Sequence, residues 1–167
     1  MRSLGIVGMC VVAAVLYGIA HDQITARICV EYFTVGHPPV FDTADPTLLG
    51  LGWGIIATWW VGLLLGAPLA VAARAGSRPK RSPGSLVRPV TRLLAVMAVG
   101  AFLAGITGWL LARAGVVFLT GPVAEILPAD RHAPFLADLW AHSASYLTGL
   151  GGGLVTLVSV WRSRGTK

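Results

Sequence analysis

Residues 46–73 read PTLLGLGWGIIATWWVGLLLGAPLAVAA and contain no charged side chain. A helix needs about 20 apolar residues to cross a bilayer core of roughly 30 Å, so this stretch is long enough to span one. Three further uncharged runs, residues 3–20, 93–112 and 139–161, have comparable lengths, and only His142 interrupts the apolar character of the last. The sequence therefore predicts an all-α integral membrane protein with a bundle of four transmembrane helices.

The composition of the 167-residue chain agrees with this prediction, because 55% of its residues are hydrophobic and only 12% are charged. A soluble domain carries roughly 25% charged residues, since its whole surface faces water. Disordered segments are polar, which this chain is not. Membrane-spanning β-strands would show segments of about ten residues with alternating hydrophobicity, and that pattern is missing. Composition thus excludes soluble, disordered and β-barrel classes.

Charged residues and turn-forming residues set the expected helix boundaries within a single transmembrane domain, residues 1–167. We expect the helices at about 3–20, extending toward 33, and at 47–73, 91–112 and 134–161. The connections are then two outer loops, 34–46 and 113–133, and one basic inner loop, 74–90.

Charges divide between the two sides of this bundle. Ten of the 13 Lys and Arg residues flank the predicted inner ends: Arg2, Arg74, Arg78, Lys80, Arg81, Arg88, Arg92, Arg162, Arg164 and Lys167. All seven acids lie on the other side: Asp22, Glu31, Asp42, Asp45, Glu125, Asp130 and Asp138. Because Lys and Arg near helix ends mark the cytoplasmic side, both termini are predicted to be cytoplasmic, with an extracytoplasmic cap of helical extensions and loops. The net charge of +6 is then a topology signal, and we expect a bacterial inner-membrane protein whose partner is the lipid bilayer and not nucleic acid.

The first uncharged run also has features of a secretory signal peptide. Arg2 precedes an apolar stretch that ends in the small residues Gly18 and Ala20, as a signal peptidase prefers. Since residues 3–20 are already long enough to span a membrane, we expect a retained helix.

Side chains suited to chemistry gather on the predicted outer side. All four histidines lie there: His21, His37, His132 and His142. His37 stands between Gly36 and Pro38 and is interpreted as a turn residue. His142 lies within an apolar run, where an ionisable group is costly, and therefore needs a partner such as Asp138 or Asp22.

The segment that follows the first span has no helix-breaking residue before Gly36. A helix that continues through it places Gln23, Arg27 and Glu31 on one face, because residues four apart are neighbours. Tyr32 belongs to an apolar stripe on this extension that is able to rest against another outer segment.

Histidine and carboxylate together predict a metal site at the outer side, with Zn, Fe or Mn as the divalent transition metals that suit such ligands. The candidate metal ligands are His21, Asp22, Glu31, Asp138 and His142, and the candidate ligand-binding residues beside them are Gln23, Arg27, Tyr32 and His132. The alternative is a structural network in which Arg27 pairs with Glu31 or Asp22 and ties the outer segments together. No closed motif such as His-Glu-x-x-His decides between the two.

Other cofactors receive weaker support from the sequence. Haem held by His21 and His142 lacks a second histidine pair, and no CxxCH attachment motif is present. Trp59 and Trp60 lie near the middle of a span, where a quinone could stack on them. Ordinary lipid and packing contacts are the alternative interpretation of these two indoles.

Two classes of function remain open from the sequence. The first is a small membrane protein that binds a metal or polar ligand, and the second is a structural or accessory subunit of a larger membrane complex. Gly62 and Gly66 have the spacing of a helix-pairing motif, which serves either a homo-oligomer or packing within one chain. A transporter is disfavoured, because transporters usually bind substrate near the midplane and charged residues are missing from the middle of these spans.

Overall fold

The computed structural model describes residues 1–165, and that part of the chain is helical with no strand. Four stretches are long and apolar enough to cross a membrane: Arg2–Ile28, Pro46–Arg74, Pro83–Arg113 and Ala129–Arg162. The prediction of an all-helical protein with four helices of spanning length is confirmed.

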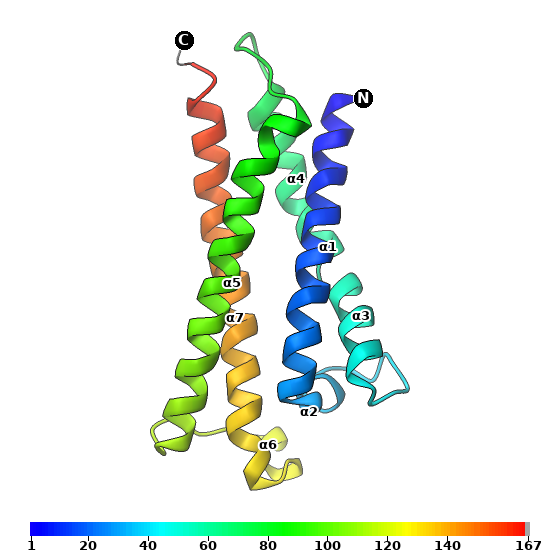
Figure 1. The fold of residues 1–167 in the computed structure, drawn as a ribbon, viewed down its shortest axis with the longest axis vertical. Coiled ribbons are helices and arrows are strands. Elements are labelled where there is room, and N and C mark those ends of the chain that lie inside the picture. Colours follow the sequence, from blue (N-terminus) through cyan, green and yellow to red (C-terminus); the bar gives the residue numbers. More distant parts are fainter. Residues whose placement is uncertain (166–167) are drawn as a thin grey trace.

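The helices form two pairs (Figure 1). Helix α1 (Arg2–Ile28) packs along α3 (Pro46–Ile56) and α4 (Trp59–Arg74), and α5 (Pro83–Arg113) packs along α7 (His132–Arg162). Fewer contacts join one pair to the other than hold each pair together.

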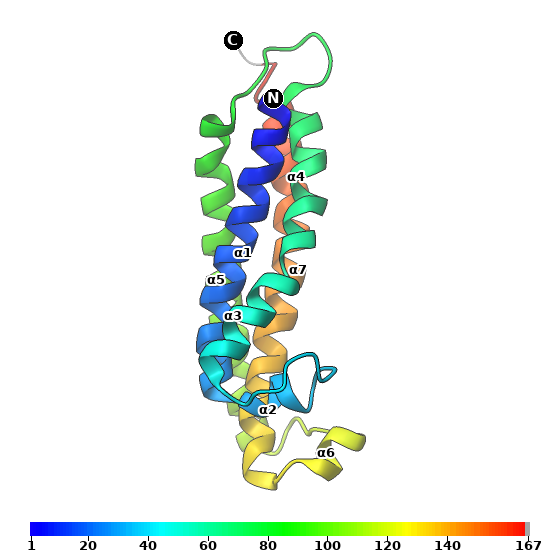
Figure 2. The same ribbon diagram turned by 90° about the vertical axis from the view of Figure 1, so that its right-hand side faces the viewer.

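The N-terminus and the end of α7 lie at one end of the bundle, together with the loop between α4 and α5 (Figure 1). The opposite end carries the short helices α2 (Val30–Thr34) and α6 (Pro122–Ile126) and the 3-10 turn η1 (Ala129–Arg131). Figure 2 shows α6 projecting sideways from the bundle. The predicted basic and acidic sides are therefore opposite ends of one elongated molecule, and Lys167 of the basic side lies outside the described residues.

Buried apolar side chains form two clusters, one toward each end. The cluster nearer the termini joins α1, α4, α5 and α7 and includes Ile6, Cys10, Leu69, Leu86 and Val160. The other joins α1, α2 and α3 to the start of α7 and includes Cys29, Tyr32, Phe33, Leu49 and Phe135.

Between these clusters, glycines bring α1 close to α3 and α4. A Cβ on Gly54 would lie 2.6 Å from the backbone of Ile19, and one on Gly62 would lie 2.6 Å from the Cα of Val11. A Cβ on Gly66 would lie 3.0 Å from the Cα of Val7. Gly62 and Gly66 therefore serve packing within the chain.

The second span differs from the single helix expected at 47–73, because it is broken at Ala57 and Thr58. Thr58 N–H bonds the Ile55 carbonyl (3.3 Å), a tighter turn than an α-helix makes, and the Thr58 hydroxyl donates to the Gly54 carbonyl. The break lies where Gly54 touches the backbone of α1. A hydroxyl that bonds the carbonyl four residues earlier often bends a helix.

The extension of the first helix is also interrupted, which corrects the expectation of one helix toward residue 33. Helix α1 ends at Ile28, Cys29 is extended (φ −146°, ψ 93°), and α2 then turns in a new direction. Glu31 consequently does not share a face with Gln23 and Arg27. The turn buries Tyr32 and Phe33 against Phe135 of α7, and this burial outweighs the local preference for a continuous helix.

The basic loop is shorter than the expected range 74–90, because α5 begins at Pro83 and not near 91. Proline is favoured in the first turn of a helix, where its missing N–H has no partner to lose. The expected outer loop 113–133 likewise contains α6 and η1, while α7 runs from His132 to Arg162, close to the expected 134–161.

Candidate metal centre

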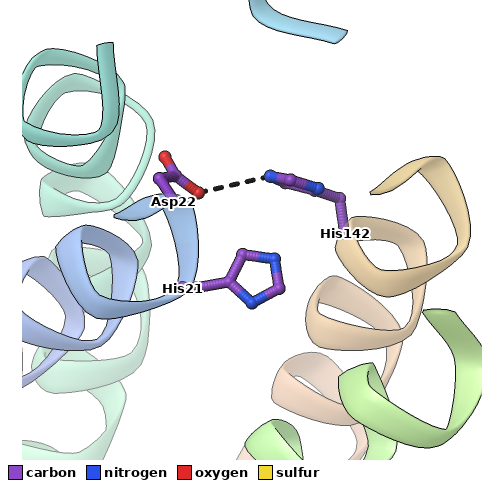
Figure 3. Close-up of side chains that lie close together, drawn as sticks. All are labelled: His21, Asp22 and His142. Carbon is purple, nitrogen blue, oxygen red and sulfur yellow. Dashed lines mark hydrogen bonds and ion pairs between the residues drawn. The ribbon is translucent and has the colours of Figure 1, made fainter. Parts of the chain in front are cut away.

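Three of the predicted metal ligands meet between the two helix pairs. His21 and Asp22 are adjacent in α1, and His142 faces them from α7 (Figure 3). One ligand atom from each residue lies within 4.8 Å of the other two. Among residues 1–165 no other group of three His, Cys, Asp or Glu side chains meets this description.

The orientation of the His142 ring is set by its own helix. Its Nδ1 lies 2.8 Å from the backbone carbonyl of Asp138, one turn earlier in α7. A carbonyl oxygen only accepts, so Nδ1 carries the hydrogen, and a neutral imidazole then has a bare lone pair on Nε2. This Nε2 lies 3.2 Å from Oδ1 of Asp22.

A lone pair facing a carboxylate oxygen at that distance is unfavourable unless a positive charge lies between them. A proton between the two atoms, on Nε2 or on the Asp22 carboxyl group, relieves the contact, and so does a bound cation. Metal-bound histidines typically donate their other ring N–H to a carbonyl or carboxylate, and the Asp138 carbonyl takes this role for His142.

Unpaired polar atoms mark the same region. His21 Nε2 and both carboxylate oxygens of Asp138 are buried without a hydrogen-bond partner among residues 1–165. Buried polar atoms in native proteins are almost always paired, so each exception calls for an explanation such as an ion. The free Nε2 of His21 lies in the three-residue group and fits a metal ligand.

Aromatic rings hold both imidazoles in place. Tyr17 stacks on His21 with ring centroids 5.8 Å apart, and Tyr32 stacks on His142 at 4.5 Å. The Tyr17 hydroxyl lies 2.8 Å from Oγ of Ser145 and thereby also links α1 to α7. Side chains locked in this way keep their ligand atoms in position without further ordering.

The candidate residues predicted from the sequence do not include Tyr17 or Ser145, although the spacing of both is informative. Tyr17 stands one helical turn before His21, and Ser145 stands three residues after His142. Residues three or four apart share a helix face. Searching those positions around each candidate ligand would have found both.

Glu31 is not brought to the cluster, because Arg131 binds it. The Arg131 guanidinium donates to both carboxylate oxygens, at 2.9 Å and 2.7 Å. These hydrogen bonds hold the pKa of Glu31 below its ordinary value. The Cys29 thiol donates to the same carboxylate at 3.3 Å, and burial raises its pKa to about 12. Cys29 is therefore a protonated thiol.

Asp138 contributes its backbone and not its carboxylate to the cluster. The side chain is completely buried and adjoins the cluster of Cys29, Tyr32 and Phe135 at the junction of α2 and α7. The expected choice of partner for His142 is thereby resolved, since its ring bonds the Asp22 side chain and the Asp138 carbonyl.

The predicted ligand-binding residues divide in the structure. Tyr32 contacts His142 through its ring. Arg27 instead donates to Gln23 and to the Thr47 hydroxyl, which fastens α1 to the start of α3. His132 Nε2 lies 3.1 Å from the Leu127 carbonyl and secures the turn before α7.

His37 behaves as the predicted turn residue. Its Nδ1 lies 2.7 Å from the Tyr32 carbonyl, where it satisfies a carbonyl of the short helix α2. Its ring contacts Tyr32 and Trp53 at centroid distances of 4.9 Å and 4.7 Å. His37 thus packs against Tyr32, whose ring in turn contacts His142.

The alternative cofactors find little support in this geometry. The rings of His21 and His142 are in edge contact, with centroids 4.5 Å apart, which leaves no room for a macrocycle between them. Trp59 and Trp60 both expose nearly half of their surface, at 48% and 43%.

Comparisons with protein-family models, curated proteins and solved structures give no match for this chain. The class defined by the structure is an all-helical protein with four helices of membrane-spanning length and a His/Asp cluster between its two helix pairs. The chemistry of that cluster is the basis for assigning a function.

Proposed function

We propose that this protein is a membrane-embedded metal-binding protein whose site consists of His21, Asp22 and His142. Insertion into a bilayer is supported by the outer surface of the spans, where Phe102, Leu147 and Leu150 expose 67%, 71% and 69% of their area. A continuous apolar surface of this kind is unfavourable in water and suits hydrocarbon.

The spacing of two arginines in α5 supports a position of this helix across the bilayer. Arg92 and Arg113 are separated by an uncharged stretch that measures about 31 Å at the helical rise, close to the thickness of a bilayer core. Counted in the same way from Ser3, about 20 residues of α1 end near Asp22. The metal site then lies at the outer boundary of the hydrocarbon.

The orientation follows from the ends of the molecule. The end that carries the N-terminus and the end of α7 contains Arg and Lys without any acid among residues 1–165, and such ends face the cytoplasm. We assign the acidic end, with α2, α6 and η1, to an extracytoplasmic cap, and the membrane to a bacterial inner membrane.

Two side chains introduced at opposite ends test the orientation. Both native cysteines are buried, so neither competes for a membrane-impermeant maleimide. In sealed cells, a Thr120→Cys variant is expected to react with the reagent, and a Lys80→Cys variant only after the membrane is opened. The reverse pattern would overturn the assignment.

One observation carries the metal site: the Nδ1 of His142 bonds the Asp138 carbonyl, so that its Nε2 faces the Asp22 carboxylate and lies beside His21. Two imidazoles and one carboxylate suit Zn, Fe or Mn. Three protein ligands also leave a coordination position open to water or to a small polar ligand, as in catalytic sites.

Metal content of the purified protein tests this proposal. Protein prepared without an affinity metal column is expected to hold about one transition-metal ion per chain, and His21→Ala and His142→Ala are expected to lose it. His132→Ala is the matched control, because it removes an imidazole outside the cluster. Wild-type protein that neither contains Zn, Fe or Mn nor binds them in titration would overturn the proposal.

A structural role for the same cluster is favoured by one further observation, the Glu31–Arg131 pair at 2.7 Å, which likewise joins the α1 side to the α7 side. In that case His142 is protonated and pairs with Asp22 as part of a network in an accessory subunit. For such a structural role, the purified protein is expected to contain no metal, and Asp22→Asn is expected to lower its melting temperature. Other membrane subunits are expected to co-purify with it and to cover the bundle.

A further inference from the structure

One face of α5 carries two cations and a long apolar surface. Arg88 and Arg92 are exposed and one turn apart. At about 100° per residue, Val99, Phe102 and Ile106 point within about 40° of the Arg88 direction. These three side chains expose 60%, 67% and 42% of their area. The arginines therefore stand at the end of a surface that fits lipid chains.

Neither arginine is neutralised by the protein. Among residues 1–165, Arg88 and Arg92 have no hydrogen bond, ion pair or ring contact, in contrast to Arg78, Arg81 and Arg164 at the same end. All seven acids of the chain lie between residues 22 and 45 or between 125 and 138, which belong to the far end of the bundle.

Two like charges one turn apart destabilise a helix, so an anion between them relieves the repulsion. Arginine forms a planar fork that binds a phosphate with two parallel hydrogen bonds. We propose that Arg88 and Arg92 form a binding site for the phosphate of an anionic phospholipid, whose acyl chains lie along Val99, Phe102 and Ile106.

This inference rests on the membrane insertion proposed above and is independent of the metal site. Arg92 directly precedes the uncharged stretch that begins at Leu93, and Arg88 lies one turn earlier, so both are at the inner boundary of the span. A phosphate at that level belongs to the headgroup layer of the cytoplasmic leaflet, where anionic lipids concentrate.

Binding of phosphatidylglycerol to the full-length protein tests the site. The lipid is titrated into protein in neutral detergent, and bound lipid is counted by native mass spectrometry, with phosphatidylcholine as the uncharged reference. The Arg88→Gln/Arg92→Gln variant is expected to bind phosphatidylglycerol roughly 25-fold more weakly, at about fivefold for each basic residue. Binding of phosphatidylcholine is expected to stay unchanged.

The matched control is Arg2→Gln/Arg162→Gln, which removes the same charge from the same end but from α1 and α7. It is expected to bind phosphatidylglycerol close to the wild-type level. Equal losses in the two double variants would overturn the site, because net charge alone would then explain binding. Circular dichroism of both variants verifies that the helices are intact.

Reconstitution separates this inference from the membrane assignment. Wild-type protein that floats with phosphatidylglycerol vesicles and resists extraction by carbonate, yet shows no preference for phosphatidylglycerol over phosphatidylcholine, would overturn the lipid site alone. Wild-type protein that fails to enter the vesicles would overturn the insertion and the lipid site together.

Discussion

His142 illustrates how a routine local contact sets the chemistry of a site. A ring nitrogen that bonds the carbonyl one turn earlier is a common way to satisfy a helix residue, yet here it also decides that Nε2 is the nitrogen left to contact other groups. In water this nitrogen would face solvent. Here it faces Asp22 in a buried position, where the electrostatic cost of an uncompensated contact is much higher.

Glu31 gives a prediction for the acid range. Because hydrogen bonds from Arg131 hold its pKa below the ordinary value of 4.5, the ion pair stabilises the fold above that pH, and its contribution is lost as the pH falls further. Glu31→Gln is expected to lower the stability by about 1 kcal/mol at neutral pH, with the difference from wild type vanishing in acid. Melting curves in detergent at both pH values measure it.

Glu125→Gln is the control for this prediction, since Glu125 is exposed and has no partner among the described residues. Its melting temperature should follow the wild type at every pH. A Glu31→Gln variant that differs from wild type by the same amount at neutral and acid pH would contradict the assigned role of the pair.

Gly54 gives a second prediction about a single residue. A Cβ at this position would lie 2.6 Å from the Cα and N atoms of Ile19, and backbone atoms cannot rotate away. Gly54→Ala is therefore expected to force α3 from α1 and to cost about 1–3 kcal/mol. Gly8→Ala in α1 has nothing within 4 Å and should be neutral or stabilising. Thermal unfolding in detergent that fails to separate the two variants would contradict this packing.

At the level of elements, the lengths of the spans could be predicted and their interruptions could not. The length of an uncharged run such as residues 93–112 can be compared directly with the thickness of a bilayer core. Four helices of spanning length could therefore be predicted by counting residues. The breaks at Cys29 and at Thr58 depend on burial of Tyr32 and Phe33 against α7 and on the close approach of α1 to Gly54. Both are contacts between distant segments, which no local pattern contains.

The same distinction applies to the candidate site. The sequence predicted that His21, Asp22 and His142 lie on one side of a membrane, and their residue types suited a metal. It also placed Glu31 and Asp138 there, and charge alone could not tell a free carboxylate from one held by Arg131. That partner lies 100 residues away along the chain.

Arg164 shows most clearly how a polar side chain helps to determine where a helix ends. The side chain is 3% exposed and donates to four backbone carbonyls. Two of these carbonyls, those of Ala72 and Ala75, lie at the end of α4. The other two belong to Arg78 and Pro79 in the following loop. The last carbonyls of a helix have no partner within the helix. Arg164 thus caps α4 and fixes the loop that leads to α5.

Arg164→Ala is accordingly expected to destabilise the protein by about 2 kcal/mol or more, because charged hydrogen bonds to several carbonyls are lost together. Arg164→Lys should recover little, since an ammonium group lacks the planar fork. The exposed neighbour Arg162→Ala is the control and should melt like wild type. Trypsin cleavage within residues 75–82 should accelerate in the Arg164 variants, and unchanged cleavage would contradict the capping role.

On the scale of the whole molecule, three polar pairs add to the apolar clusters that join the two helix pairs. Tyr17–Ser145, Asp22–His142 and Glu31–Arg131 each join the α1 side to the α7 side, and all three lie toward the acidic end. Lipid is as apolar as the helices, so hydrophobic burial does not drive helices together within a bilayer. If the bundle is inserted as proposed, specific contacts set how the two pairs align.

A bound metal ion is then expected to hold the two helix pairs together. Its ligands come from α1 and α7, so the unfolded or separated helices do not present the same set. Zn²⁺ at about 100 times its dissociation constant is expected to stabilise the wild type by roughly 2.7 kcal/mol, seen as a higher melting temperature that a chelator reverses. His142→Ala should lose this response, whereas His132→Ala should keep it. A response of equal size in both variants would place the stabilising ion elsewhere in the molecule.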